Sequence, residues 1–89
     1  MIRKHYLFYG RVQGVGFRFT AYHIAVDLGI TGWVQNLMDG SVEACFQGEE
    51  SKIEQLIFKL QHSYCIKINS MKVENLAILK HETSFQMKN

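Results

Sequence analysis

Residues 30–48 read ITGWVQNLMDGSVEACFQG, and the order of the predicted elements can be built outward from this stretch. Its first half is typical of a strand, and the pair Asp39-Gly40 that follows is a strong hairpin signal because both residues tolerate a positive φ. In the returning half the residues alternate between two faces, with Val42, Ala44 and Phe46 on one and Glu43, Cys45 and Gln47 on the other. We therefore predict an antiparallel hairpin with one apolar face.

Apolar residues recur with a helical period on both sides of this hairpin. Before it, the pattern ends at Gly29, a natural C-terminal stop, and predicts a helix at roughly 19–29. After it, a second stripe predicts a helix at roughly 50–62, and Ser51 and Glu54 have the spacing of a capping box near its start. The apolar positions of the two stripes are Ala21, Ile24, Ala25 and Leu28, and Ile53, Leu56, Ile57 and Leu60.

Strands are predicted at the two ends of the chain. Residues 5–13 alternate well enough for a strand, with Tyr6, Phe8 and Val12 on one face. Near the other end, MKVENLAIL predicts a strand at about 70–80, and SFQMK adds a short final one. The conformation of the segment before the fourth strand, residues 63–70, is not predicted.

The predicted order is β-α-β-β-α-β with an extra C-terminal strand. Each strand–helix–strand unit needs a right-handed crossover. Two such units joined by a hairpin give an antiparallel sheet with both helices on one face. The expected fold class is therefore α+β, a ferredoxin-like sandwich. No proline, low-complexity tract or linker interrupts the sequence, so we expect a single domain over residues 1–89.

Composition narrows the classes of function. Apolar residues make up 47% of the 89 residues, and the net charge is +2, which is too mild for a typical nucleic-acid binder. No window of about 18 apolar residues exists, and the N-terminus does not resemble a signal peptide. Cys45 and Cys65 lack metal-ligand spacing, so we expect reduced, semi-buried thiols in a cytoplasmic protein.

The stretch GRVQGVGFR, residues 10–18, is the first candidate site. Gly14 and Gly16 let the chain take left-handed conformations and let a ligand approach the backbone. The loop leads into a helix N-terminus, where unpaired N–H groups favour an anion, and Arg18 supplies a fork of donors suited to two phosphate oxygens. The alternative is a tight strand-to-helix turn with a solvated Arg18. The Walker motif does not fit, because Phe17-Arg18 stands where that motif requires lysine followed by serine or threonine. The dinucleotide-binding motif does not fit, because Phe19 stands where that motif requires its third glycine.

Asn36 is the second candidate. It lies near the end of the predicted strand GWVQN, just before the hairpin turn. Its amide both donates and accepts hydrogen bonds, so it can hold a water molecule without taking the proton. The alternative is a strand-end asparagine that forms an Asx-turn.

GRVQGVGFR, GWVQN and DGSVEACFQG, taken together and in this order, resemble the acylphosphatase family over about residues 8–60. The resemblance implies hydrolysis of small acyl phosphates to carboxylate and inorganic phosphate, with no metal or cofactor. It places the phosphate-binding arginine at Arg18 and the water-positioning asparagine at Asn36. It places the phosphate cradle at the backbone N–H groups of Gly14, Val15, Gly16, Phe17 and Arg18.

The resemblance also implies the partners. We expect a small-molecule acyl phosphate as substrate, inorganic phosphate or sulfate as product or inhibitor, no nucleic acid, no membrane, and a monomer. The segment SYCIKINSMKVENL, residues 63–76, departs from the family because many members carry Gly-Pro after the second helix. The C-terminus, SFQMKN, also resembles the usual Phe-x-Ile ending only loosely, so whether the last strand supports Arg18 is left open.

Two alternatives share the predicted topology. RNA-recognition domains carry their aromatic motif on the third strand, whereas here GVGFRF follows the first strand, so RNA binding is disfavoured. A closer alternative is an acylphosphatase-like domain that serves carbamoyl phosphate, as in hydrogenase-maturation carbamoyltransferases. Such domains are fused to much more chain, and a length of 89 residues favours the free-standing enzyme.

Overall fold

The computed structural model describes residues 1–89 and places five strands and two helices along the chain. In order they are β1 (Ile2–Arg11), α1 (Phe17–Leu28), β2 (Thr31–Asn36), β3 (Val42–Gly48), α2 (Glu50–Gln61), β4 (Lys67–Leu76) and β5 (Phe85–Met87). This order confirms the predicted ferredoxin-like arrangement with its short extra strand. The fourth strand was placed too late by the sequence pattern, because β4 begins at Lys67 and ends at Leu76.

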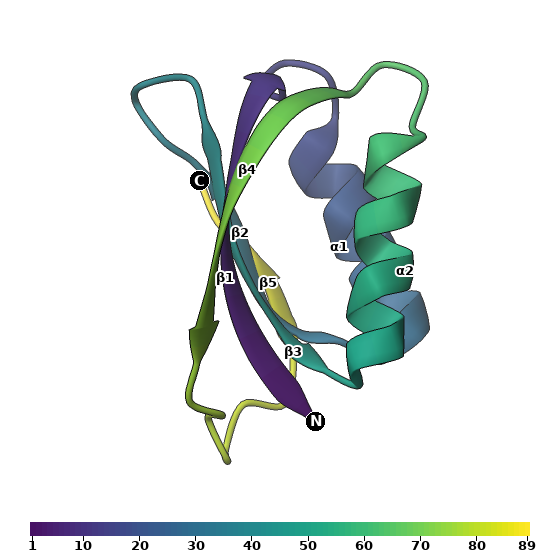
Figure 1. Ribbon diagram of the computed structural model, residues 1–89, viewed down its shortest axis with the longest axis vertical. Helices are drawn as coiled ribbons and strands as arrows, with labels where there is room; N and C mark the ends of the chain where they lie inside the picture. Colours follow the sequence, from purple (N-terminus) through teal and green to yellow (C-terminus); the bar gives the residue numbers. More distant parts are fainter.

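The strands form one sheet in the order β4-β1-β3-β2-β5. β1 pairs antiparallel with β3 and β4, and β2 pairs antiparallel with β3. The short β5 pairs parallel with β2, so the sheet is mixed, whereas the sequence predicted an antiparallel sheet. Figure 1 shows α1 and α2 side by side on one face of the sheet, with the other face uncovered.

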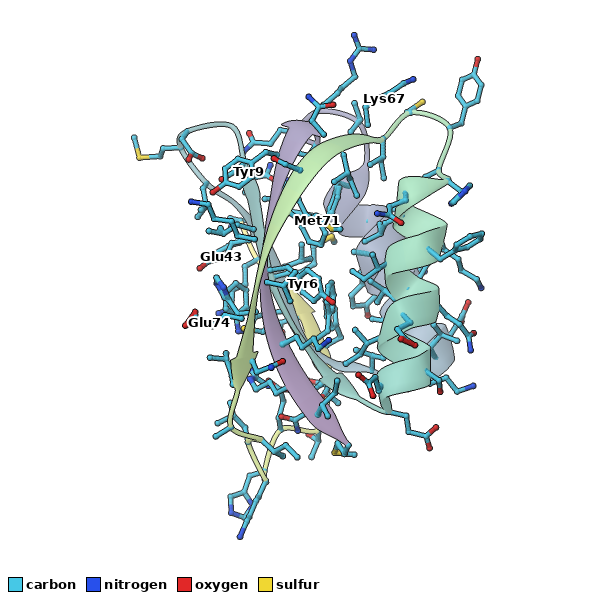
Figure 2. The ribbon with its side chains drawn as sticks, in the orientation of Figure 1. Tyr6, Tyr9, Glu43, Lys67, Met71 and Glu74 are labelled. Carbon is cyan, nitrogen blue, oxygen red and sulfur yellow. The ribbon has the colours of Figure 1, made fainter.

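The core lies between the sheet and the helices (Figure 2). The apolar face predicted for the first strand is confirmed, since Tyr6, Phe8 and Val12 are all buried. The hairpin contributes Val42, Ala44 and Phe46, which have no exposed area. The helix stripes add the buried residues Ala21, Ala25, Ile53, Leu56 and Leu60. The apolar residues predicted from alternation in the strands and from helical spacing in the helices therefore pack into one core.

Two local predictions were wrong. The start of α2 has no capping box: Glu49 is the N-cap residue, no side chain caps the helix, and Ser51 lies inside it. The reason is that β3 runs to Gly48, so the chain enters the helix directly from the strand. The thiols also differ from each other, because Cys45 is buried and Cys65 is exposed in the turn after α2. Burial raises the pKa of Cys45.

Neither helix is long and apolar enough to cross a membrane.

Candidate active site

The glycine loop ends in an open helix N-terminus. Gly14 and Gly16 have φ angles of 73° and 80°, a region that favours glycine because it has no Cβ. Gly16 is the N-cap of α1, so no side chain caps the helix, and no acidic residue lies in the first turn. The first N–H that bonds back within the helix is that of Thr20, which donates to the Gly16 carbonyl oxygen at 2.9 Å. The preceding N–H groups are therefore free for an anion.

Helix α1 begins earlier than the sequence pattern predicts. Phe17, expected in the loop, is its first residue and is buried in the core, and Arg18 is the second. Burial of Phe17 anchors the helix start, since its ring lies 4.9 Å from that of Phe8 in β1. Arg18 consequently projects from a rigid first turn rather than from a loop.

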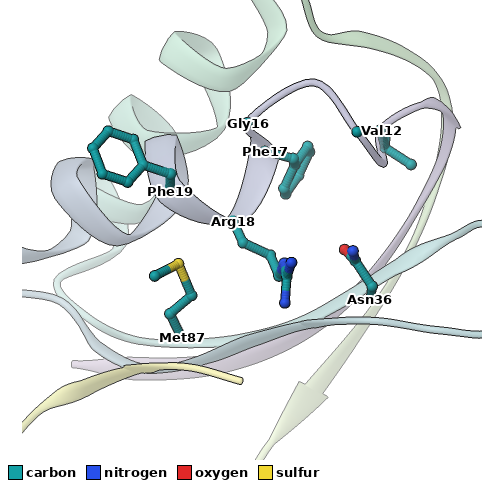
Figure 3. A pocket seen from close by; sticks show the side chains of 8 residues that line it. Val12, Gly16, Phe17, Arg18, Phe19, Asn36 and Met87 are labelled. Carbon is teal, nitrogen blue, oxygen red and sulfur yellow. The ribbon is translucent and has the colours of Figure 1, made fainter. Parts of the chain in front are cut away.

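A cavity of about 170 Å³ opens beside this helix start (Figure 3). It is lined by Val12, Gly14, Gly16, Phe17, Arg18, Phe19, Asn36 and Met87. The structure thus brings together all the predicted site residues except Val15, which is partly buried and packs against the core. Arg18 is the only charged residue in the lining, and neither a carboxylate nor a histidine joins it.

Arg18 is held by the end of the chain. Its side chain is half-buried, and Nη1 donates a hydrogen bond to the carbonyl oxygen of Lys88 at 2.7 Å. Lys88 is itself fixed, because its N–H donates to the Val34 carbonyl oxygen at 2.8 Å. This answers the question that the sequence left open: the segment after β5 supports Arg18. The carbonyl uses one guanidinium donor and leaves the other donors free.

Asn36 faces the same cavity from the last position of β2. Its Oδ1 atom is buried and has no hydrogen-bond partner in the protein. The Asx-turn alternative does not describe this residue, since the turn is made by Asp39, whose Oδ1 accepts hydrogen bonds from Ser41 N and Oγ. These bonds lower the pKa of Asp39. The Asn36 amide is therefore left with an unused acceptor beside the cavity.

Sequence reasoning missed Gln13, which joins the two parts of the site. Its Nε2 donates to the carbonyl oxygens of Leu37 and Ser41 at 2.7 and 2.8 Å. These bonds tie the start of the glycine loop to the hairpin that follows Asn36. The only sequence signal was an amide immediately before the loop. Lys88, Phe19 and Met87 were also missed as site residues, although Phe19 ends the run GVGFRF.

No three His, Cys, Asp or Glu side chains come together in a group that could hold a metal ion.

Known proteins resemble this chain in both sequence and structure. A curated acylphosphatase of Thermoplasma volcanium is 54% identical over 59 residues, which cover 66% of this chain and 60% of that protein. One of Koribacter versatilis is 38% identical over 86 residues, or 96% of this chain and 78% of that protein. The chain thus spans less than two thirds of the length of the Thermoplasma protein.

Solved structures agree in fold over the whole chain. The crystal structure of acylphosphatase from Bacillus subtilis superimposes with a TM-score of 0.91 at 29% identity and covers 100% of both chains. The crystal structure of T. kodakarensis HypF gives a TM-score of 0.85 at 30% identity, covering 100% of this chain and 12% of that one. The protein-family model described as Acylphosphatase matches residues 4–87, which is nearly the whole of this chain. With its glycine loop, helix start and strand-end asparagine in one cavity, this chain belongs to the acylphosphatase family.

Proposed function

We propose that this protein hydrolyses the carboxyl-phosphate bond of small acyl phosphates to a carboxylate and inorganic phosphate. One observation carries the proposal: the open N-terminus of α1, the Arg18 guanidinium and the unpartnered Asn36 Oδ1 surround a single cavity. The first two suit a phosphoryl group, and the third suits a water molecule.

The phosphoryl group is bound by the helix start. The free N–H groups after Gly16 donate to its oxygens, and the positive end of the α1 dipole favours its negative charge. The free donors of Arg18 bind two further oxygen positions with a fixed charge. Because these donors are already oriented by α1 and by Lys88, they stabilise the phosphoryl oxygens in the transition state without reorganising.

Asn36 orients the attacking water. A buried polar atom without a partner costs about 1–3 kcal/mol, and a water that donates to Oδ1 removes this cost. The water oxygen forms a bond to phosphorus while the bond from phosphorus to the acyl oxygen breaks. The electron pair of that bond leaves with the carboxylate, and the water proton passes to a phosphoryl oxygen. Such a stable leaving group needs little protonation, so positioning and electrostatics suffice without a general base.

The experiment that tests the proposal is a continuous assay of acetyl phosphate hydrolysis by the purified protein. We expect turnover that survives EDTA, because the residues described here supply the positive charge on their own. Loss of turnover in EDTA with recovery on one added divalent ion would contradict this mechanism. Absence of turnover under all conditions would remove the function.

Inorganic phosphate provides a second test of the same site. We expect it to inhibit competitively and to shift the amide NMR signals of residues 13–18, because product and substrate share the phosphoryl end. Shifts that cluster elsewhere on the protein would show that the loop is not the anion site.

A second candidate function is the processing of carbamoyl phosphate. It is favoured by the likeness to HypF, in which a region of the same fold covers this entire chain. Carbamoyl phosphate carries the same phosphoryl end, so the cavity accommodates both substrates. A kcat/KM for carbamoyl phosphate that clearly exceeds the value for acetyl phosphate would favour this candidate.

A further inference from the structure

We propose that the edge of the sheet formed by residues 70–76 of β4 is a contact surface for a second copy of this chain, and that two copies pair there as antiparallel strands in a symmetric dimer. The inference is independent of the proposed hydrolysis, because no residue of β4 lines the active-site cavity. The monomer expected from the family resemblance is then the state of the protein in dilute solution.

The backbone of β4 is open along one side. β4 is the first strand in the sheet order, so β1 is its only neighbour and the N–H and C=O groups on its other side have no strand partner. Such an edge is a template for a further strand. The register with β1 shifts between Tyr9 and Gly10, which leaves residues 70–76 as the regularly paired part of β4. All of these residues are at least partly exposed, and none is proline.

The side chains of this edge alternate between the two faces of the sheet. Figure 2 shows Met71 on the side of the helices and Glu74 on the uncovered side. Val73 lies on the helix side, opposite Tyr6 of β1, and is 50% exposed. Lys72 lies on the uncovered side with Glu74, because residues two apart in a strand share a face. Lys72 and Glu74 thus flank Val73 with opposite charges, and neither forms an ion pair within the chain.

One register suits a second copy better than its neighbours. If the twofold axis passes through Val73, Lys72 of each copy lies directly opposite Glu74 of the other. Opposite charges at such positions stabilise a strand pair, whereas like charges destabilise it. An axis at Lys72 or at Glu74 would place that residue opposite its own copy. Val73 is also the central residue of 70–76, so this register alone lets the whole segment overlap.

The pairing closes at two copies. Each copy uses the same edge, so the contact is isologous and cannot extend into a fibre. It joins two five-stranded sheets, and the edges that stay open are then the two β5 strands, which have three residues each. Strands this short resist further pairing. The contact itself is small for a protein interface, so we expect a weak dimer with a Kd of roughly 0.1–1 mM.

Sedimentation equilibrium of the wild type tests the dimer. We expect a change from monomer to dimer over about 0.02–2 mM, a range that brackets a weak contact. A reducing buffer keeps the exposed Cys65 from forming disulfide-linked dimers. Over the same range, the amide NMR signals of residues 70–76 should shift more than those of the rest of the chain. A wild type that stays monomeric throughout would overturn the inference and leave the edge to a strand of another protein.

Charge reversal tests the surface and its register. Lys72→Glu and Glu74→Lys each place like charges opposite one another twice, so each variant alone should dimerise at least about tenfold more weakly than wild type. An equimolar mixture of the two should form a mixed dimer, because every pair across the contact then joins opposite charges again. The double variant Lys72→Glu/Glu74→Lys should dimerise like wild type for the same reason.

Lys52→Glu is the matched control, because it changes the net charge by the same amount on α2, away from the edge. We expect its dimerisation to stay within about twofold of wild type, since exposed charges outside the contact contribute little. Circular dichroism shows which variants fold, and if a single variant does not, the double variant decides. Failure of the double variant to dimerise, or equal weakening by Lys52→Glu, would overturn the inference.

Discussion

Two arginines of this protein, Arg3 and Arg18, are held in opposite ways. Arg3 in β1 is 5% exposed, and its Nη1 donates to Glu82 Oε1 at 2.7 Å and to Gln47 Oε1 at 3.1 Å. Arg18 bonds only to a neutral carbonyl oxygen, that of Lys88. A guanidinium paired with a carboxylate has its charge offset inside the protein, whereas one held by a carbonyl keeps its charge available for an anion.

The surroundings of the two arginines follow the same division. Glu82 also accepts a hydrogen bond from Thr31, and Gln47 exchanges two bonds with the backbone of Leu79, so the Arg3 network fastens the segment between β4 and β5 to the sheet. Around Arg18, by contrast, several polar groups have no hydrogen-bond partner in the protein, namely the first N–H groups of α1 and the Oδ1 atom of Asn36. Complete pairing serves stability, and incomplete pairing around a cavity leaves groups for a ligand.

The largest expected effect comes from Arg18→Ala. We expect kcat/KM for acetyl phosphate to fall by about 10³-fold or more, with KM raised and kcat lowered, because in the proposed mechanism the guanidinium binds the phosphoryl group in both the ground and transition states. Arg18→Lys should recover only part of this loss, since an ammonium keeps the charge but not the planar fork. Thermal unfolding should be nearly unchanged. Full activity in Arg18→Lys would show that charge alone is needed.

Asn36→Ala should act on one kinetic parameter only. If the amide positions water, kcat falls by roughly 10²–10³-fold and KM stays nearly constant. The buried Oδ1 has no protein partner to lose, so circular dichroism and the melting temperature should match wild type closely. A kcat within about twofold of wild type would remove Asn36 from the mechanism.

Arg3→Ala should lower the stability of the protein and leave its activity nearly unchanged, the opposite of the result expected for Arg18→Ala. It leaves the part-buried Glu82 carboxylate without its partner, and breaking a buried pair in this way costs about 3 kcal/mol of unfolding free energy. For a domain of this size, 1 kcal/mol shifts the melting temperature by about 4–8 °C. Measured well below the melting temperature, kcat should remain near wild type. A large loss of kcat with unchanged stability would mean that the Arg3 network acts on the site.

The smallest effect is expected at a pair on the open face of the sheet. His5 Nε2 lies 2.8 Å from Glu43 Oε2, and this contact holds the pKa of Glu43 below its ordinary value of 4.5. A lowered folded pKa means that the pair stabilises the protein above pH 4.5 and that this stabilisation is lost as the pH falls through the folded pKa.

Glu43→Gln tests this directly. We expect the variant to be slightly less stable than wild type at pH 6, by about 1 kcal/mol or less for a partly exposed pair, and the difference to be smaller at pH 3. A difference that grows at low pH would contradict the assigned sign. Activity should follow wild type at both pH values, because Glu43 does not line the cavity.

Several errors in the sequence predictions share one physical origin. The capping-box spacing at Ser51 is a local pattern, but the path of the chain out of β3 decides where α2 begins. The strand Phe85–Met87 is too short for its alternation to specify a partner, so its parallel pairing with β2 was not predictable. Likewise nothing local distinguishes exposed Cys65 from buried Cys45, because burial depends on which elements cover a position.

Sequence patterns alone were enough to predict the β-α-β-β-α-β order, the apolar faces of its elements, the glycine loop and the family to which the chain belongs. These features are encoded in short spacings, because alternation, helical period and turn residues act through neighbouring positions. The surroundings of Arg18, in contrast, could be known only from the folded chain. Lys88 lies 70 positions away in sequence from the guanidinium it holds, and its neighbour Met87, the last residue of β5, also lines the cavity. Such contacts depend on which strands become neighbours in the folded sheet.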